Sequence, residues 1–171
     1  MQLRGFLEEH FEREALERCL LAAPGIRTLL EDELDPERWY PSPRPIRLVE
    51  TLDREVGRGD RALVAEAGRY LARRTAERDE DFTPELVFAL LPDVWKGFLA
   101  IGDIEVAKVG RGHGRLETRK LPDSSLALCA AIAGYLDEAL RLAGGRDVDV
   151  RLVEAVALGD DKDVFEATWS S

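Results

Sequence analysis

The hydrophobic positions after residue 123 change from a helical period to a strand period at a pair of glycines. Across 124–143, apolar residues recur every three or four positions, as they do along one face of an α-helix. Gly144-Gly145 favours a helix end, because glycine adopts the left-handed conformation at little steric cost. Apolar residues then alternate over 148–158, and a turn at 159–162 leads into a second alternating run at 164–169. We predict a long helix followed by a β-hairpin.

The preceding part of the chain predicts a helical half and a first hairpin. Helical apolar spacing and breaker residues indicate helices at 3–22, 26–33, 45–56 and 61–78, and a last one from Pro84 to Gly102 that is interrupted at Pro92. Two strands, 104–109 and 115–121, flank a glycine-rich tip. The order is therefore helices, hairpin, helix, hairpin. This order predicts an α+β fold in which an N-terminal helical half packs on a four-stranded antiparallel sheet.

Length and charge narrow the functional classes. The chain has 171 residues, which favours one domain over 1–171, with a helical half at 1–102 and the hairpin-helix-hairpin at 103–171. Its net charge is −10 and no run of Lys or Arg exceeds two, so nucleic acid is not an expected partner. No apolar stretch approaches membrane-spanning length and no signal peptide is visible, which predicts a cytoplasmic protein.

Residues able to catalyse a reaction are scarce. His10 and His113 are the only imidazoles, and the chain has neither a Gly-x-Ser-x-Gly elbow nor a dinucleotide-binding fingerprint. Cys19 and Cys129 lie far apart in helical patterns, which is typical of buried, reduced thiols. We expect a protein that is not an enzyme and has no catalytic residues.

The C-terminal segment has a recognisable spacing. Glu154, Gly159, Asp160 and Phe165 fit the pattern Glu-Cys-x-x-x-Gly-(Asp)-x-x-Cys-x-Phe, with Ala155 and Asp163 in place of the two cysteines. In this segment the chain resembles V4R (4-vinyl-reductase-like) domains, a family of ligand-sensing modules. The resemblance implies the fold that V4R domains share with haem nitric-oxide-binding domains and Bet3-type TRAPP subunits. A looser likeness, at Trp39-Tyr40-Pro41, Gly68 and 98–106, is to uncharacterised bacterial paralogues of the same layout.

The resemblance also bears on metals and cofactors. Because both cysteine positions are substituted, we expect that a zinc site of the V4R kind has been lost and that the chain binds no metal or cofactor. Tyr40-x-Ser42-x-Arg44 matches the haem-propionate motif of haem nitric-oxide-binding domains. In those domains the motif lies in the sheet and follows the helix with the iron-ligating histidine. Here it precedes the first hairpin by some sixty residues, so we interpret it as accidental.

The resemblance implies a non-enzymatic sensory or interaction module. Members of the family bind small hydrophobic or aromatic ligands between helices and sheet and often dimerise through the helical half. One alternative is a dimeric protein-binding scaffold that has no ligand; another is a tetrapyrrole-related reductase or haem-binding protein. Candidate cavity residues are apolar or aromatic, although side chains of this kind are commoner as plain core: Trp39, Tyr40, Trp95, Phe98, Cys129 and Tyr135.

Glu154 is a further candidate for the cavity. Strand alternation places it on the same face as Leu152 and Val156. A carboxylate inside the protein has to be paired or protonated. Glu154 is then either a polar anchor for a ligand, or a structural residue that bonds to an arginine or is turned outward by a bulge. We favour the structural explanation, since buried carboxylates are common in ordinary ion-pair networks.

Overall fold

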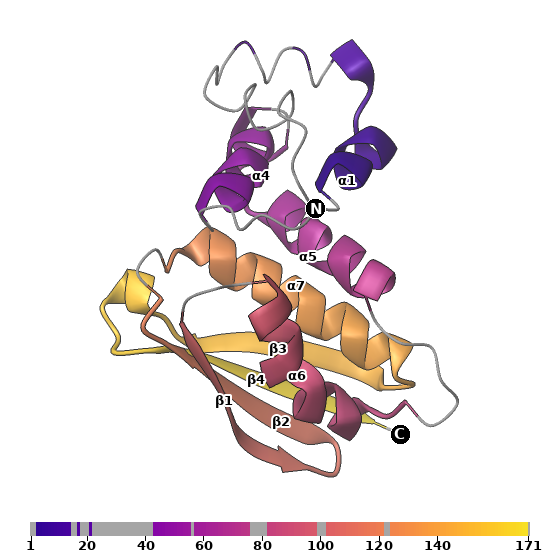
Figure 1. Cartoon of the computed structure of the whole chain (residues 1–171), viewed down its shortest axis with the longest axis vertical. Coiled ribbons are helices and arrows are strands. Elements are labelled where there is room, and N and C mark those ends of the chain that lie inside the picture. Colours follow the sequence, from indigo (N-terminus) through magenta and orange to yellow (C-terminus); the bar gives the residue numbers. More distant parts are fainter. Residues whose placement is uncertain are drawn as a thin grey trace.

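A computed structural model describes residues 3–14, 17, 21, 43–55, 57–75, 82–98, 102–121 and 124–170. In chain order the described part has four helices, a hairpin, a fifth helix and a second hairpin (Figure 1). The helices and strands are α1 (Leu3–His10), α4 (Pro43–Glu55), α5 (Ala62–Thr75), α6 (Pro84–Phe98), β1 (Asp103–Gly110), β2 (His113–Arg119), α7 (Leu126–Leu142), β3 (Arg146–Glu154), a short 3₁₀ helix (Val156–Leu158) and β4 (Asp163–Ser170).

The four strands form one antiparallel sheet in the order β1-β2-β4-β3. Leu116 of β2 lies opposite Phe165 of β4, which in turn lies opposite Leu152 of β3. Both Leu116 and Phe165 are fully buried, so this row of side chains faces the core. The predicted hairpin-helix-hairpin and antiparallel sheet are confirmed.

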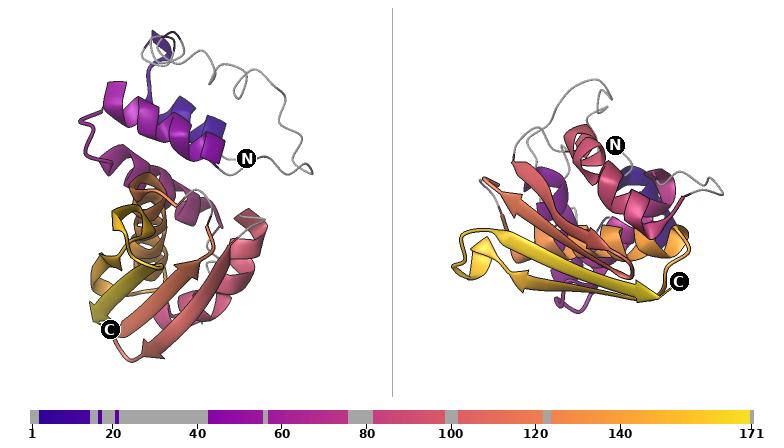
Figure 2. Two further views of the ribbon diagram at one scale, coloured as in Figure 1. Left: turned by 90° about the vertical axis from the view of Figure 1, so that its left-hand side faces the viewer. Right: turned by 90° about the horizontal axis from the view of Figure 1, so that it is seen from below.

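The helices lie in layers on one face of this sheet (Figure 2). α6 packs against β1 and β2, and α7 packs against β3 and β4. α5 packs along α7, while α4 contacts α5 and α7 from further out. One hydrophobic cluster joins α6, α7 and the sheet, and a second joins α1, α4, α5 and the first turn of α7. The helical half therefore rests on the sheet through α6 and α7.

Two glycines allow α5 and α7 to pack closely. A Cβ atom at Gly68 of α5 would collide with the backbone carbonyl of Ala131 in α7. A Cβ atom at Gly134 of α7 would likewise collide with the carbonyl of Ala65 in α5. Because the obstructing atoms belong to the backbone, they have no flexible side chain that can move aside. Gly68 and Gly134 are therefore counterparts in the close packing of the two helix backbones.

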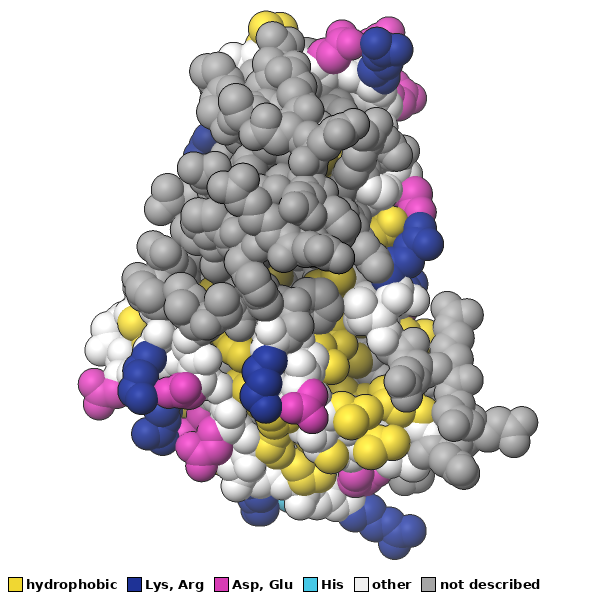
Figure 3. Space-filling model, viewed as in Figure 1, with side chains coloured by type: hydrophobic (Ala, Val, Ile, Leu, Met, Phe, Trp, Pro, Cys, Tyr) yellow, Lys and Arg dark blue, Asp and Glu magenta, His cyan; other side chains and the backbone are white. Residues whose placement is uncertain are grey.

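The opposite face of the sheet is polar. Glu117 of β2 lies there with its side chain only 8% exposed, and Lys162, Arg119 and Arg115 surround it. The inner face carries the buried row with Leu116 and Phe165. Apolar side chains also gather at the molecular surface, in the lower half of the view in Figure 3. The sheet thus has the hydrophobic-in, polar-out alternation of an antiparallel sheet with one solvated face.

Three predicted boundaries are wrong. α1 ends at His10, so the predicted helix is broken at 11–12 before helical residues resume at 13 and 14; the His10 ring Nδ1 donates to the Phe6 carbonyl at 3.0 Å within the last turn of α1. α6 continues through Pro92, because Phe88 and Leu91 before it and Trp95 after it are all buried on one side. The strand β3 ends at Glu154, and Val156–Leu158 forms an exposed 3₁₀ turn. The helix predicted at 26–33 lies outside the described residues.

Candidate functional site

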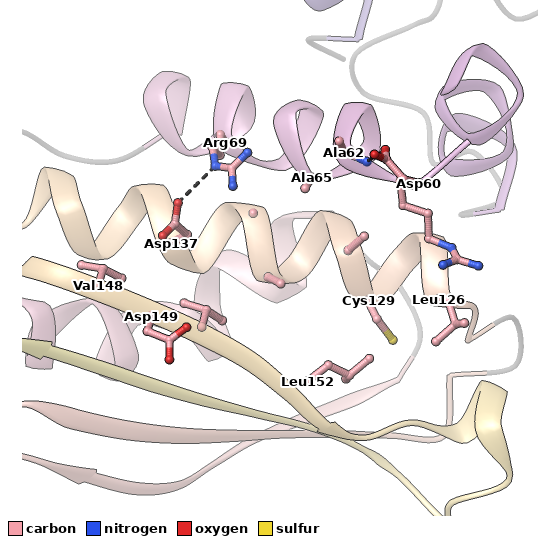
Figure 4. Close-up of a pocket in the computed structure, with 15 residues that line it drawn as sticks. Asp60, Ala62, Ala65, Arg69, Leu126, Cys129, Asp137, Val148, Asp149 and Leu152 are labelled. Carbon is pink, nitrogen blue, oxygen red and sulfur yellow. Dashed lines mark hydrogen bonds and ion pairs between the residues drawn. The ribbon is translucent and has the colours of Figure 1, made fainter. Parts of the chain in front are cut away.

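An open groove of about 470 Å³ lies between α5, α7 and β3 (Figure 4). α5 and α7 form its helical wall and β3 runs along the other side, so the groove follows the boundary between the helical half and the sheet. Fifteen residues line it, of which ten are apolar or glycine: Ala62, Ala65, Leu126, Cys129, Ala130, Ala133, Gly134, Val148, Val150 and Leu152. The remaining five are charged: Asp60, Arg61, Arg69, Asp137 and Asp149.

The periods of the three elements place these side chains. Ala62, Ala65 and Arg69 recur at helical spacing on one face of α5. Val148 and Val150 alternate along β3 and point to the same side of the strand as Leu152. The wall is made of small residues because bulky ones would fill the space beside two closely packed helices. The groove is therefore apolar along its walls and charged at its two ends.

Paired charges close one end of the groove. Arg69 Nε donates to Asp137 Oδ2 at 3.1 Å, and its Nη1 donates to Glu66 Oε2 at 3.2 Å. Burial lowers the pKa of Arg69, but these two carboxylates outweigh it and raise the pKa overall. Asp137 also accepts from Arg141, and Asp149 pairs with Arg151 Nε at 2.6 Å. The charges at this end therefore neutralise one another.

A buried carboxylate fixes the backbone at the other end of the groove. Asp53 of α4 is 3% exposed, and its Oδ2 accepts from the Arg61 backbone N–H at 2.8 Å. Its Oδ1 accepts from the Leu63 N–H at 3.2 Å. Asp60 caps α5 by accepting from the Ala62 N–H at 3.0 Å. These bonds fix Arg61 in the left-handed region, at a φ of 68°, which is unusual for a residue other than glycine.

Cys129 lines the groove, and Asp163 is close to its thiol. Burial raises the pKa of Cys129 to about 12, and the negative charge of Asp163 adds to this effect. Asp163 is 1% exposed; its Oδ2 accepts from the hydroxyls of Thr118 and Ser124, at 3.1 Å and 2.8 Å. Its Oδ1 accepts from the Val156 N–H at 2.9 Å. The second cysteine position of the V4R pattern is thus occupied by a carboxylate in a hydrogen-bond network.

Of the predicted cavity residues, the groove includes Cys129. Trp95 is buried on α6, and its indole Nε1 has no hydrogen-bond partner in the described part. Tyr135 is half-buried against the core beside α5, where its hydroxyl accepts from Thr75 at 3.4 Å and burial raises its pKa. Phe98 ends α6 and its side chain is not described. Trp39 and Tyr40 lie outside the described residues.

Glu154 does not line the groove. The register of β3 shifts between Leu152 and Glu154, and Glu154 Oε1 accepts from Arg115 Nη2 at 3.4 Å. Both features of the structural explanation, the bulge and the arginine partner, are therefore present. The same shift explains why the face shared with Leu152 was predicted wrongly, since strict alternation fails at a bulge.

The residues that sequence reasoning missed are the small ones of the groove. Ala65, Ala130 and Ala133 have no chemistry of their own and read as ordinary helix-forming residues. A sequence pattern that could have predicted the groove is the presence of two faces of small residues, one on 62–69 and one on 130–134. That pattern becomes meaningful once the two segments are known to pack together, which periodicity alone does not show.

Comparisons with known proteins find structural relatives. No protein-family model matches the chain, and no curated protein does. A protein from work on haem distortion in the H-NOX family superposes with a TM-score of 0.74 at 10% identity, covering 99% of this chain and 92% of that one. The fold is that of the H-NOX domains. An oxygen-binding H-NOX domain related to soluble guanylate cyclases gives a TM-score of 0.70 at 9% identity, with 99% and 92% covered.

A further relative is the H-NOX protein from S. oneidensis in its Fe(II)NO state, with a TM-score of 0.60 at 16% identity and coverages of 92% and 97%. H-NOX domains are the haem nitric-oxide-binding domains named in the expected kinship, and identities this low establish the shared fold alone. The narrower resemblance to V4R domains stays a prediction. Within the described part, no helix is both long and apolar enough to span a membrane.

The residues of this chain do not fit haem in the H-NOX manner. The helix before the first hairpin is α6, and its sequence, PELVFALLPDVWKGF, contains no histidine. β2, with the sequence HGRLETR, contains no Tyr-x-Ser-x-Arg motif. His10 is on α1 with its Nδ1 bonded to the Phe6 carbonyl, and His113 begins β2 at the hairpin tip. The expected axial ligand and propionate motif are therefore both missing from these two elements.

Proposed function

We propose that this chain is a non-enzymatic sensory module that binds a small, largely apolar ligand in the groove between α5, α7 and β3. The observation that supports the proposal is the groove itself, at about 470 Å³ with a continuous apolar lining. This volume lies within the range of about 300–1,000 Å³ that is usual for small-molecule sites. Its position between helices and sheet is the one that the resemblance to V4R domains implies.

The module works without haem. As the resemblance implies it, haem binding of the H-NOX kind needs a histidine on a helix that is followed by the propionate motif in the sheet; α6 has no histidine and β2 does not have the motif. A tetrapyrrole reductase or a haem sensor is therefore a poorer explanation than a haem-free sensor. We expect the protein expressed with a haem precursor to show no Soret absorption band.

The module also works without zinc of the V4R kind. Ala155 offers no ligand, and Asp163 is engaged with two hydroxyls and a backbone N–H. Among the described residues there is no group of three or more His, Cys, Asp or Glu side chains that could hold a metal ion. Dimerisation through the helical half remains a prediction from the resemblance.

Binding of small apolar probes tests the proposed function. Octan-1-ol, indole and 2-naphthol serve as probes, and amide chemical-shift changes locate where they bind. We expect the changes to centre on the groove residues Ala133, Val150 and Leu152. Ala133→Phe places a ring in the groove, so we expect it to weaken binding at least about tenfold, which corresponds to about 1.4 kcal/mol.

The matched control is Ala89→Phe, which adds the same ring at an exposed position of α6 away from the groove. It should leave probe affinity unchanged. Chemical-shift changes that map outside the groove, or a panel in which no probe binds, would contradict the proposed function.

A further inference from the structure

Arg61 and Asp60 are the charged residues of the groove lining that form no ion pair within the described part of the chain. Arg69, Asp137 and Asp149 each form ion pairs. Asp60 has the α5 backbone as a partner, since it accepts from the Ala62 N–H. Among the described residues, no carboxylate lies within ion-pair distance of the Arg61 guanidinium, and the hydrogen bonds of Arg61 are made by its backbone, the N–H donating to Asp53. The groove therefore has one neutralised end and one end with an available cation.

The backbone of Arg61 is held in an unfavourable conformation. A φ of 68° is unfavourable for a residue with a Cβ atom, whereas glycine would adopt it freely. Two neighbouring positions of the same loop, Gly57 and Gly59, are glycines, and Gly59 has a similar φ of 70°. An arginine is nevertheless present at position 61. Strained residues of this kind concentrate at ligand-binding sites.

The loop around Arg61 is rigidly attached to the fold. Besides its two side-chain bonds, Asp53 accepts from the Gly59 N–H through its main-chain carbonyl at 3.0 Å. The Ala65 N–H donates to the Arg61 carbonyl at 3.0 Å, so Arg61 leads directly into α5. The guanidinium thus projects from a fixed backbone position at the edge of an apolar groove.

We infer that the groove binds an anionic amphiphile, with the carboxylate or comparable anion of the ligand on Arg61 and its apolar part along Ala65, Ala133 and Val150. This inference rests on the proposed function and names its ligand class. Ala62 and Arg69 are seven residues apart, so the α5 wall is about 10 Å long at 1.5 Å per residue. That length suits a short alkyl chain or one or two aromatic rings.

The guanidinium and the α5 N-terminus are the positive groups at this end of the groove. The neighbouring carboxylates, Asp53 and Asp60, are engaged with backbone N–H groups at the start of α5. A cationic head group would meet Arg61 itself, and a neutral one would leave the guanidinium without a partner. Because Arg61 is exposed, water and salt weaken the attraction, so the preference for an anion should be moderate and should decrease with ionic strength.

Three ligands with the same tail test the inference: octanoate, octan-1-ol and octylammonium, titrated into the full chain by calorimetry at low salt. We expect octanoate to bind about threefold to tenfold more tightly than octan-1-ol, and octylammonium to bind most weakly. Raising the salt should reduce the preference for octanoate. Arg61→Gln should remove the preference and leave octan-1-ol affinity unchanged.

Arg61→Gly tests whether a loss of the preference for octanoate comes from removal of the guanidinium or from a destabilised fold. Glycine suits the positive φ, so this variant should be at least as stable as the parent while it also loses the preference for octanoate. Arg58→Gln is the matched control, since Arg58 is an exposed arginine of the same loop that does not line the groove. It should retain the preference.

The outcomes separate the two proposals. Equal binding of octanoate and octan-1-ol in the groove, or tighter binding of octylammonium, overturns the role of Arg61 and leaves the proposed function standing. A preference for octanoate that survives in Arg61→Gln and Arg61→Gly also overturns that role. If none of the three ligands binds in the groove, the inference and the proposed function fail together.

Discussion

Glu117 is a single residue whose surroundings set its protonation. Lys162 Nζ donates to its Oε2 at 2.6 Å and Arg119 at 2.9 Å, and Arg115 contacts Oε1 at 3.4 Å. The hydrogen bonds from Lys162 and Arg119 lower the pKa of Glu117 to about 2, although burial acts in the opposite direction. Sequence reasoning found no role for Glu117, because its three partners come from separate positions along β2 and from the turn before β4.

The lowered pKa of Glu117 predicts a pH-dependent stability. Its folded pKa of about 2 is below the usual 4.5, so its contribution is complete above pH 4.5 and is lost as the pH falls to about 2. Glu117→Gln should lower the free energy of unfolding at pH 7 by about 1–3 kcal/mol. This deficit should shrink between pH 4.5 and pH 2, as measured by urea unfolding.

Glu166→Gln provides the control, because Glu166 is half-exposed and pairs with Arg115 on the same face of the sheet. It should change stability by less than about 1 kcal/mol. A deficit for Glu117→Gln that stays constant from pH 7 to pH 2 would show that the carboxylate charge is unimportant.

Among the helices and strands, periodicity predicted well those whose ends are set by local sequence signals. α7 begins with Ser125, whose hydroxyl accepts from the Leu128 N–H at 3.1 Å, and ends before Gly144 at a φ of 86°. The glycine signal is local and was visible in the sequence. The continuation of α6 through Pro92 was not, because it depends on burial of residues on both sides of the proline against α7 and the sheet.

The contact between α5 and α7 gives the second stability prediction. Gly134→Ala gains helix propensity of about 1 kcal/mol but places a Cβ atom against the Ala65 carbonyl. Overpacking against backbone costs more than this gain, so we expect a net loss of about 1–3 kcal/mol. Thermal and urea unfolding measure it, and because Gly134 also lines the groove, probe affinity should change as well.

Ala89→Gly, at an exposed position of α6, gives the propensity effect alone and should cost about 1 kcal/mol. If Gly134→Ala proved more stable than the parent, the close approach of α5 and α7 at this glycine would be wrong.

For the molecule as a whole, the sequence predicted the architecture better than the site. The order of helices and strands along the chain and the two antiparallel hairpins follow from the periods and breakers of successive segments. The groove does not, since it is the space left between α5, α7 and β3 once two glycines bring the helices together. Most of the candidates for a cavity were aromatic residues, whereas the groove is lined mainly by small and aliphatic residues, with Cys129 the candidate among them. Such residues carry no catalytic or metal-ligating group, so a pattern of reactive side chains does not reveal them.

Restoring cysteines at positions 155 and 163 tests whether this chain shares a metal site with V4R domains in addition to the fold. Asp163 is near the Cys129 thiol, and its Oδ1 bonds to the N–H of Val156, the residue after Ala155. Positions 129, 155 and 163 therefore converge. Ala155→Cys/Asp163→Cys would bring three thiols together, and we expect this variant to bind one Co²⁺ or Zn²⁺ per chain, with a thiolate-to-cobalt charge-transfer band.

The experiment uses a Cys19→Ala background, so that the remaining thiols are the three of interest. Because the pKa of Cys129 is about 12 in the parent, binding has to displace its proton, and affinity should rise with pH. Cys129→Ala in the double variant should weaken the metal and remove part of the band, whereas Ala155→Cys alone should not bind. If the double variant folds and binds no metal, then the spacing shared with V4R domains does not correspond to a shared site, and the kinship extends no further than the H-NOX fold.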